Sequence, residues 1–82
     1  MTPLAIIRLM DAAAAHNGLS AHSVGRYASG SGDFYARLLA GHDITTRRAH
    51  RVVQWLSDHW PADLDWPADI PRPALRAEDE AA

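Results

Sequence analysis

Apolar residues recur at helical spacing in two long stretches of the chain, one at its start and one past its middle. In the first stretch, residues three or four apart form one apolar stripe: Leu4, Ile7, Met10 and Ala14. Thr2 can cap such a helix, Pro3 suits its first position, and Asn17-Gly18 is a typical stop. The pattern therefore predicts a helix from Pro3 to about Asn17.

A second, longer amphipathic pattern lies between residues 45 and 60. Its apolar members again recur at intervals of three and four: Ala49, Val52, Val53, Leu56 and Trp60. Thr45 or Thr46 can cap the start of this helix. We expect it to end near His59.

The segment between these two helices, from Leu19 to Gly41, has the sequence LSAHSVGRYASGSGDFYARLLAG. Its residue types predict two short helices joined by a tight turn. The positions expected to be buried are Val24, Ala28, Tyr35 and Leu38. Gly25 is the small residue expected where the two helices cross, and Gly41 is a common type of helix stop.

The first of the two short helices is expected to start after Ser20, its cap, and to end near residue 29. Residues 29–31 form the turn. The second helix is expected from about Gly32 to Ala40, with Ser31 or Asp33 as its cap. Four helices result, so the predicted fold is all-α.

With this spacing, the segment resembles the helix-turn-helix of phage repressor-like (Xre/Cro-type) regulators. The likeness rests on a small residue followed four positions later by the turn, a Ser that opens the second helix, and Arg37-Leu38 before Gly41. It implies a four-helix lambda-repressor-like bundle over residues 1–60, with the motif at 19–41. It also implies that the second short helix enters the major groove of DNA. The DNA-facing positions of the family correspond here to Ser31, Gly32, Asp33 and Arg37.

Each of these side chains can contact a base edge or a phosphate. Some of them can instead have a structural role within the protein. Arg37 can reach guanine or a phosphate, or pair with a nearby Asp on a solvated face. Asp33 can accept from a cytosine amino group, or act as an N-terminal cap in the field of the helix dipole. Ser31 can contact a phosphate or a base edge. Phe34 is expected in the core rather than on a thymine methyl group.

Phosphate contacts are expected from helix N-termini and flanking Arg residues, because backbone N–H groups aimed at phosphates fix the register of such a domain. The residues expected in this role are Ser20, His22, Thr45, Thr46, Arg47 and Arg48. The alternative for Arg47, Arg48 and Arg51 is the ordinary solvated face of an amphipathic helix.

Charge is distributed unevenly along the chain, whose formal net charge is -2. Residues up to Trp60 include six Arg and four Asp, whereas the remainder includes two Arg and six acidic residues. The predicted bundle is thus mildly basic and the tail acidic. All eight basic residues are Arg, which offers bidentate contacts to phosphate and guanine, although a GC-rich genome produces the same bias.

Other chemistries find little support in the composition. The 82 residues suffice for one small domain, and without Cys there is no disulfide or thiolate metal site. The five His show no paired ligand spacing, so we expect no metal ion or cofactor. A small helical bundle with Gly-poor loops offers little room for a substrate pocket, so we expect neither a small-molecule ligand nor enzymatic activity. The apolar start is interrupted by Arg8 and Asp11 and shows no leader, so we expect a cytoplasmic protein without a membrane span.

The chain after the last predicted helix is different, because WPADLD at 60–65 is followed directly by WPADIP at 66–71. We interpret this repeat as too short to be a structural unit, and its Pro residues exclude a continuous helix. Residues 61–82 are expected to form an extended Pro/Trp-rich tail against the bundle or a partner, with a frayed end over 74–82. The exposed apolar residues expected to form a dimer contact, or alternatively to complete the core, are Trp55, Trp60, Trp66 and Ile70.

Together these features favour a sequence-specific transcriptional regulator that binds double-stranded DNA, a repressor acting as a dimer on a two-fold operator. The alternative is a protein-interaction module with the same fold, antitoxin-like or a phage-encoded inhibitor, that uses its tail on a partner and does not read DNA. Gly32, Asp33 and the acidic tail favour the module. Arg37, Arg47, Arg48 and the spacing of the turn favour DNA.

Overall fold

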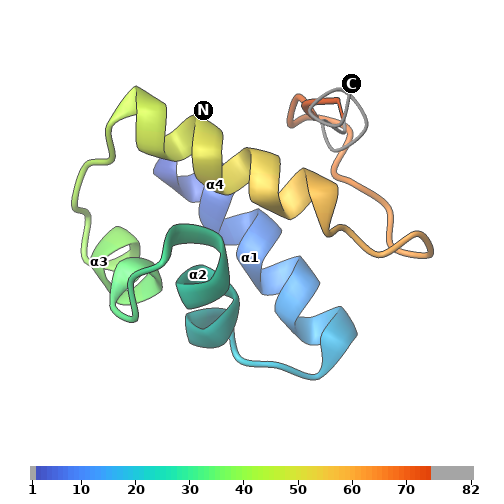
Figure 1. Ribbon diagram of the computed structural model, residues 1–82, viewed down its shortest axis with the longest axis horizontal. Helices are drawn as coiled ribbons and strands as arrows, with labels where there is room; N and C mark the ends of the chain where they lie inside the picture. Colours follow the sequence, from blue (N-terminus) through green and yellow to red (C-terminus); the bar gives the residue numbers. More distant parts are fainter. Residues whose placement is uncertain (1, 75–82) are drawn as a thin grey trace.

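The computed structural model describes residues 2–74, which form four α-helices and no strand (Figure 1). In chain order the helices are α1 (Pro3–Asn17), α2 (Ala21–Ser29), α3 (Phe34–Leu39) and α4 (Thr46–Asp58). The prediction of an all-α chain with four helices is confirmed. None of these four helices is long and apolar enough to cross a membrane. Met1 and residues 75–82, which include nearly all of the end expected to be frayed, lie outside the described part of the chain.

Three of the helices begin at a hydroxyl side chain, as the sequence predicts. The side-chain oxygen atoms of Thr2, Ser20 and Thr45 each accept from the backbone N–H three residues later, at 3.1 to 3.2 Å. Each bond satisfies one of the N–H groups that the start of a helix leaves unpaired. α1 also ends as predicted, at Gly18, whose φ of 69° is a left-handed conformation that Gly adopts without strain. The predicted bounds of α1, α2 and α4 are therefore correct to within one or two residues.

α3 is shorter than the sequence pattern predicts, because it begins at Phe34 rather than near Gly32. Asp33 occupies the N-cap position, but its carboxylate makes no capping hydrogen bond. Instead it accepts from the hydroxyl of Ser31 at 2.5 Å. Asp33, one of the two residues predicted as the cap, therefore has the N-cap position, but the expected capping hydrogen bond is not formed because the side chains of Ser31 and Asp33 bind each other.

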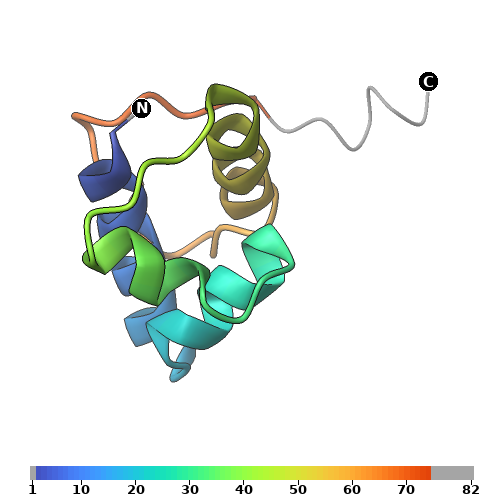
Figure 2. The same cartoon turned by 90° about the vertical axis from the view of Figure 1, so that its left-hand side faces the viewer.

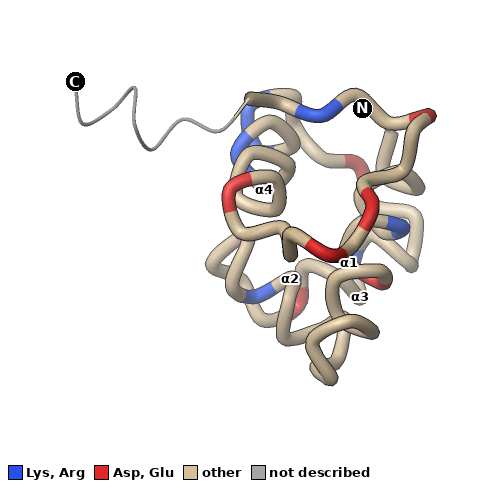
Figure 3. The backbone as a smooth tube through the Cα atoms, turned by 90° about the vertical axis from the view of Figure 1, so that its right-hand side faces the viewer, with Lys and Arg blue, Asp and Glu red and all other residues tan. Residues whose placement is uncertain are grey.

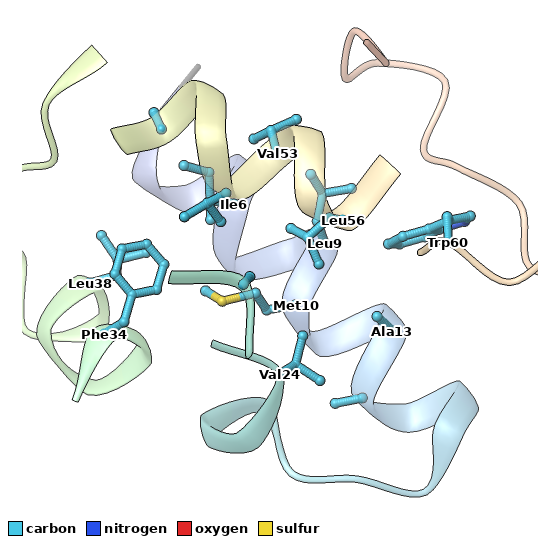
Figure 4. Close-up of a cluster of buried hydrophobic side chains, with 14 of the residues drawn as sticks. Ile6, Leu9, Met10, Ala13, Val24, Phe34, Leu38, Val53, Leu56 and Trp60 are labelled. Carbon is cyan, nitrogen blue, oxygen red and sulfur yellow. The ribbon is translucent and has the colours of Figure 1, made fainter. Parts of the chain in front are cut away.

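The core lies between the helices, and α1 packs against each of the other three. Figure 4 shows side chains from every helix converging on one apolar cluster. The residues of the middle segment that are buried include Val24, Ala28, Phe34 and Leu38, as predicted. Tyr35, also predicted to be buried, is only half-buried, because its hydroxyl reaches the surface and donates to the Asp11 carboxylate at 2.6 Å. That bond joins α3 to α1.

α2 passes close to both α3 and α1 at Gly25, as the sequence predicts. A Cβ atom at this position would lie 3.3 Å from Cβ of Tyr35 and 3.4 Å from Sδ of Met10. These distances are slightly below the optimal separation of non-bonded heavy atoms, so a larger residue would push the helices apart. The turn that follows passes through Gly30, whose φ of 80° is again left-handed. Both the crossing and the turn thus depend on residues without a side chain.

The chain beyond α4 folds back onto the helices and completes the core. Trp60 and Ile70, expected among the exposed candidates for a dimer contact, are only 8% and 4% exposed. Trp66 is half-buried and packs edge-on against Trp60, with ring centroids 4.8 Å apart. Trp55 is also half-buried and stacks on His59. Trp60, Trp66 and Ile70 thus complete the core of their own chain, which is the second of the two alternatives given for them.

The two copies of the six-residue repeat adopt the same turn. In each copy the indole N–H donates to the backbone carbonyl four residues later, at 2.7 Å from Trp60 to Leu64 and from Trp66 to Ile70. The backbone N–H of that same residue donates to the carbonyl of the Pro that follows the Trp, at 3.2 and 3.1 Å. The interpretation of the repeat as too short to be a structural unit is wrong, because the indole closes a turn within one copy.

Both turns are also joined to α1 through the Asp of the repeat. Asp63 lies 3.0 Å from Nε2 of His16, and Asp69 lies 2.7 Å from Nη1 of Arg8. These partners are eight residues apart in α1, a little more than two helical turns, and so lie on one face of that helix. The chain therefore runs antiparallel to α1 and reaches its beginning (Figure 2).

The last described residues are held by α4. Ser57, which is buried, donates its hydroxyl to the carbonyl of Pro73 at 2.7 Å and accepts from Nε of Arg72 at 3.1 Å. Gln54 donates to the carbonyl of Ala74. Residues 61–74 thus run from the end of α4 along α1 and back to α4, and we call them the strap.

Candidate nucleic-acid interface

α3, the loop after it and the start of α4 surround a hollow of about 390 Å³. It lies at one end of the molecule, on the left-hand side of Figure 1. Five of the ten residues predicted to contact DNA line this α3–α4 hollow: Ser31, Asp33, Arg37, Thr45 and Arg48. Residues predicted separately to face bases and phosphates therefore meet at one place.

The helical spacing of α3 separates the charged side chains of the hollow from the core. Phe34 and Leu38, four residues apart, are buried and point into the core (Figure 4). Asp33 and Arg37, likewise four apart, have side chains that are 63% and 59% exposed. α3 and its N-cap residue thus present one apolar face to the bundle and one charged face to solvent.

Arg48 connects the start of α4 to α3. Its backbone N–H donates to Oγ1 of Thr45, and its guanidinium lies over the ring of Phe34, 5.2 Å from the ring centroid. A cation is attracted to the face of an aromatic ring by the ring's negative quadrupole. Arg48 is therefore oriented toward α3 from the α4 side of the hollow.

Asp33 is an acidic member of this group and is held in place by Ser31. The hydroxyl of Ser31 donates to Oδ1 of Asp33, and this hydrogen bond lowers the pKa of the carboxyl below its ordinary value. The nearby guanidinium groups of Arg37 and Arg48 lower the pKa further. Asp33 therefore carries a negative charge at neutral pH.

Arg37 and Asp33 form a solvent-exposed ion pair. This pairing is the alternative to a DNA contact that the sequence allows for Arg37. Nη1 of Arg37 lies 3.8 Å from Oδ2 of Asp33, at the long end of ion-pair distances. Both side chains are more than half exposed, and ion pairs in such positions contribute little to stability. The pair can therefore be exchanged for contacts with a ligand at low cost.

Thr46 and Arg47, also predicted to contact phosphate, extend the charged surface along α4. They line a neighbouring hollow together with His50 and Arg51. Figure 3 shows the basic positions of α4 in its first half, whereas acidic positions are found along the strap. Within residues 2–74, no acidic side chain forms an ion pair with Arg47, Arg48 or Arg51. The start of α4 thus carries exposed positive charge, and the charge of Arg48 lies near the carboxylate of Asp33.

Ser20, His22 and Gly32 are not brought into the α3–α4 hollow. Ser20 caps α2, and the ring of His22 packs edge-on against Tyr35, with centroids 5.0 Å apart. Gly32 is exposed in the turn before α3. A contact with DNA at these three positions stays a prediction.

The loop between α3 and α4 contributes residues that the sequence patterns do not single out. His42, Asp43 and Ile44 all line the hollow. One signal could have found them. The loop lies between a helix stop at Gly41 and a cap at Thr45, so it is short enough to bring the two helices together at this point.

The α3–α4 hollow offers hydrogen-bond donors and an acceptor side by side on an exposed surface. Two guanidinium groups and hydroxyls can donate, and the Asp33 carboxylate can accept. Phosphates offer acceptors alone, whereas base edges in the major groove offer both kinds of group. The arrangement can therefore recognise a nucleic acid through its backbone and its bases.

Within residues 2–74, no group of three or more His, Asp or Glu residues lies close enough to hold a metal ion.

No family model, curated protein or solved structure gives a significant match to this chain.

Proposed function

We propose that this chain is a sequence-specific DNA-binding regulator of transcription, in which α2 and α3 form a helix-turn-helix of the phage repressor-like type. The observation that carries the proposal is the meeting of Arg37 and Arg48 at the α3–α4 hollow. Guanidinium groups from two helices on one exposed surface match the acceptors of a duplex, on phosphates and on guanine. The close crossing of the helices at Gly25 and the left-handed turn at Gly30 also support the proposal.

In this proposal α3 is the recognition helix and enters the major groove. The residues toward base edges are Ser31, Gly32, Asp33 and Arg37. The start of α4 lies beside the phosphates, where Arg47, Arg48 and the N–H groups capped by Thr45 bind them together with Thr46. Ser20 and His22 bind phosphate on the other side of the groove.

The regulator acts as a repressor and as a dimer on a two-fold operator. A single six-residue α3 reaches few base pairs, and a second copy doubles the sequence that is read. Trp55 and the exposed Tyr27 line one hollow between α2 and α4. The strap leaves their apolar surface uncovered, and this surface is available for the dimer contact.

Binding to duplex DNA and its dependence on Arg48 test the proposal. Fluorescence anisotropy with a labelled random-sequence duplex over a salt series should show affinity falling steeply as salt rises, because bound counterions are released from the phosphates. Arg48→Ala should weaken binding to every duplex and reduce the salt slope by about 1.

Arg26→Ala is the matched control for this experiment. It removes an equal charge from an exposed position of α2 that does not line the α3–α4 hollow, and it should leave the salt slope unchanged. Absence of duplex binding, or an equal effect of the two substitutions, would contradict the proposal.

A second candidate function is the protein-interaction module, antitoxin-like or an inhibitor, that keeps this fold without reading DNA. The observation that favours it is the presence of two acidic side chains at the hollow, Asp33 and Asp43, because carboxylates repel phosphates. The same salt series separates the two candidates. A module of this kind shows no salt-dependent affinity for duplex DNA.

A further inference from the structure

Asp33 has an unusual position for a residue on a DNA-binding face. Phosphates repel its negative charge, so it weakens binding to every duplex unless it gains a contact that offsets this repulsion. An ionised carboxylate can only accept hydrogen bonds, so the contact has to come from a donor. In the major groove the donors on base edges are the amino groups of cytosine and adenine.

We propose that Asp33 and Arg37 together read a cytosine and a guanine that lie in the same or adjacent base pairs, an inference that rests on the proposed function because it requires α3 in the major groove. Asp33 accepts a hydrogen bond from the cytosine amino group. Arg37 donates to N7 and O6 of the guanine.

The chemistry of the two base edges favours cytosine over adenine as the partner of Asp33. Adenine presents its amino group beside N7, which is an acceptor and repels a carboxylate, whereas cytosine presents the amino donor alone. This argument requires the ionised form of Asp33. The hydrogen bond from Ser31 favours that form, because it lowers the pKa of the carboxyl.

The geometry around Asp33 prepares both side chains for this role. The Ser31 hydroxyl holds Oδ1 and leaves Oδ2 on the side of Arg37. Oδ2 and Nη1 of Arg37 are 3.8 Å apart, close to the spacing of about 3.4 Å between successive base pairs. The acceptor and the donor are thus already spaced as two neighbouring base edges require.

Selection of duplexes from a random library, followed by affinity measurements on the best duplex and its point variants, tests this inference. The wild-type chain should select a cytosine and a guanine at the same or adjacent pairs. Asp33→Asn should lose at least about fivefold of the preference for cytosine, the lower end of what one good base contact discriminates, and keep the guanine. Because an amide both donates and accepts, the preference should move toward adenine. Ser31→Ala, which releases the carboxylate, should lose part of the cytosine preference.

Asp43→Asn is the matched control, since Asp43 lines the same hollow from the loop after α3. It removes an equal charge without changing α3, so it should raise the affinity for all duplexes and leave the selected sequence unchanged. An unchanged helical circular dichroism signal shows that each variant is folded.

The outcomes separate this inference from the proposed function. If Asp33→Asn selects the same sequence as the wild type, or changes it only as Asp43→Asn does, the inference is overturned while DNA binding stands. If the wild-type chain selects no sequence, the proposed function is overturned and the inference with it.

Discussion

The strap and the α3–α4 hollow use polar side chains in opposite ways. At the strap and its junction with α4, the indole N–H groups of Trp60 and Trp66 donate to backbone carbonyls of the strap at 2.7 Å, and the hydroxyl of Ser57 in α4 donates to the carbonyl of Pro73. At the hollow, Asp33 and Arg37 approach each other only to 3.8 Å and are more than half exposed. Buried polar groups require partners within the protein, whereas exposed charges can keep theirs in solvent. The strap is therefore held by polar contacts within the chain, whereas the charged groups of the hollow are exposed to solvent.

The pairing of charged side chains also differs between the strap and the hollow. In the strap, Asp69 forms an ion pair with Arg8 of α1, and Asp63 lies 3.0 Å from Nε2 of His16. At the start of α4, Arg47 forms no ion pair with an acidic side chain among residues 2–74, and Arg48 is near Asp33 without a direct ion pair. Substitutions in the strap should thus change the free energy of unfolding, and substitutions at the hollow should change binding.

Deleting residues 65–82 should have the largest effect. The deletion removes Trp66 and Ile70 and uncovers Trp60, and the loss of one large core side chain already costs about 3–5 kcal/mol. The melting temperature followed by circular dichroism should therefore fall by more than about 10 °C. The number of chains per particle, obtained from the mass measured by light scattering, should stay the same because these side chains pack within their own chain.

Deleting only residues 75–82 is the control, since it keeps all of the described strap contacts and should lower the melting temperature less than the longer deletion does. If the longer deletion preserves the melting temperature, the strap contributes no stability and the contrast with the hollow disappears. A halved number of chains per particle would show instead that the strap forms a dimer contact.

Arg37→Ala should show the opposite behaviour, with a large effect on binding and a small one on stability. We expect a loss of about 1–3 kcal/mol of binding free energy on the preferred duplex, measured by anisotropy, and a weaker preference at one base pair. The melting temperature should be nearly unchanged, as for other exposed positions. Arg48→Ala, by comparison, should weaken all sequences alike. Equal losses on preferred and random duplexes would make Arg37 a phosphate contact.

Ser57→Ala should destabilise the fold by less than the deletion, by about 1–2 kcal/mol. The substitution removes the acceptor of Arg72 Nε and the donor to Pro73, both near a buried position. Denaturant unfolding measures this loss. In a double-mutant cycle with Arg72→Ala, the two losses should be less than additive because they remove one shared contact. Full additivity would mean that Ser57 and Arg72 stabilise the fold independently.

The helices could be predicted from the sequence because their limits depend on neighbouring residues. The caps at Thr2, Ser20 and Thr45 act within one turn, and so does the stop at Gly18. The start of α3 was predicted too early for a related reason. Short polar side chains can bind each other instead of the backbone. Ser31 and Asp33, the two residues predicted as the cap of α3, bind each other in this way.

The strap could not be placed from the sequence, because its position depends on residues far apart in the chain. The repeat puts an Asp at the same position of each copy, and α1 has His16 and Arg8 eight residues apart. Neither pattern alone identifies its partner. The hollow is an intermediate case: its helical residues could be predicted from their spacing, but loop residues 42–44 have no periodicity that would reveal them.

An exposed ion pair, Arg8–Asp69, joins the strap to the first half of α1. Arg8 donates to the carboxylate of Asp69 at 2.7 Å, and this hydrogen bond lowers the pKa of Asp69 below its ordinary value. A carboxyl whose pKa is lower in the folded than in the unfolded state, where it is about 3.9, stabilises the fold at higher pH. That contribution is lost as the pH falls through the folded pKa.

Asp69→Asn should therefore lower the melting temperature slightly at neutral pH, and the difference from the wild type should vanish once the pH falls below the lowered pKa of Asp69 in the folded state. High salt should also reduce the difference, because the side chains of Arg8 and Asp69 are 47% and 66% exposed. Asp65→Asn is the control. Asp65 lies in the same strap without an ion pair among residues 2–74, so its substitution should have no effect at any pH. A difference that persists in acid would show that Asp69 stabilises the strap through something other than its charge.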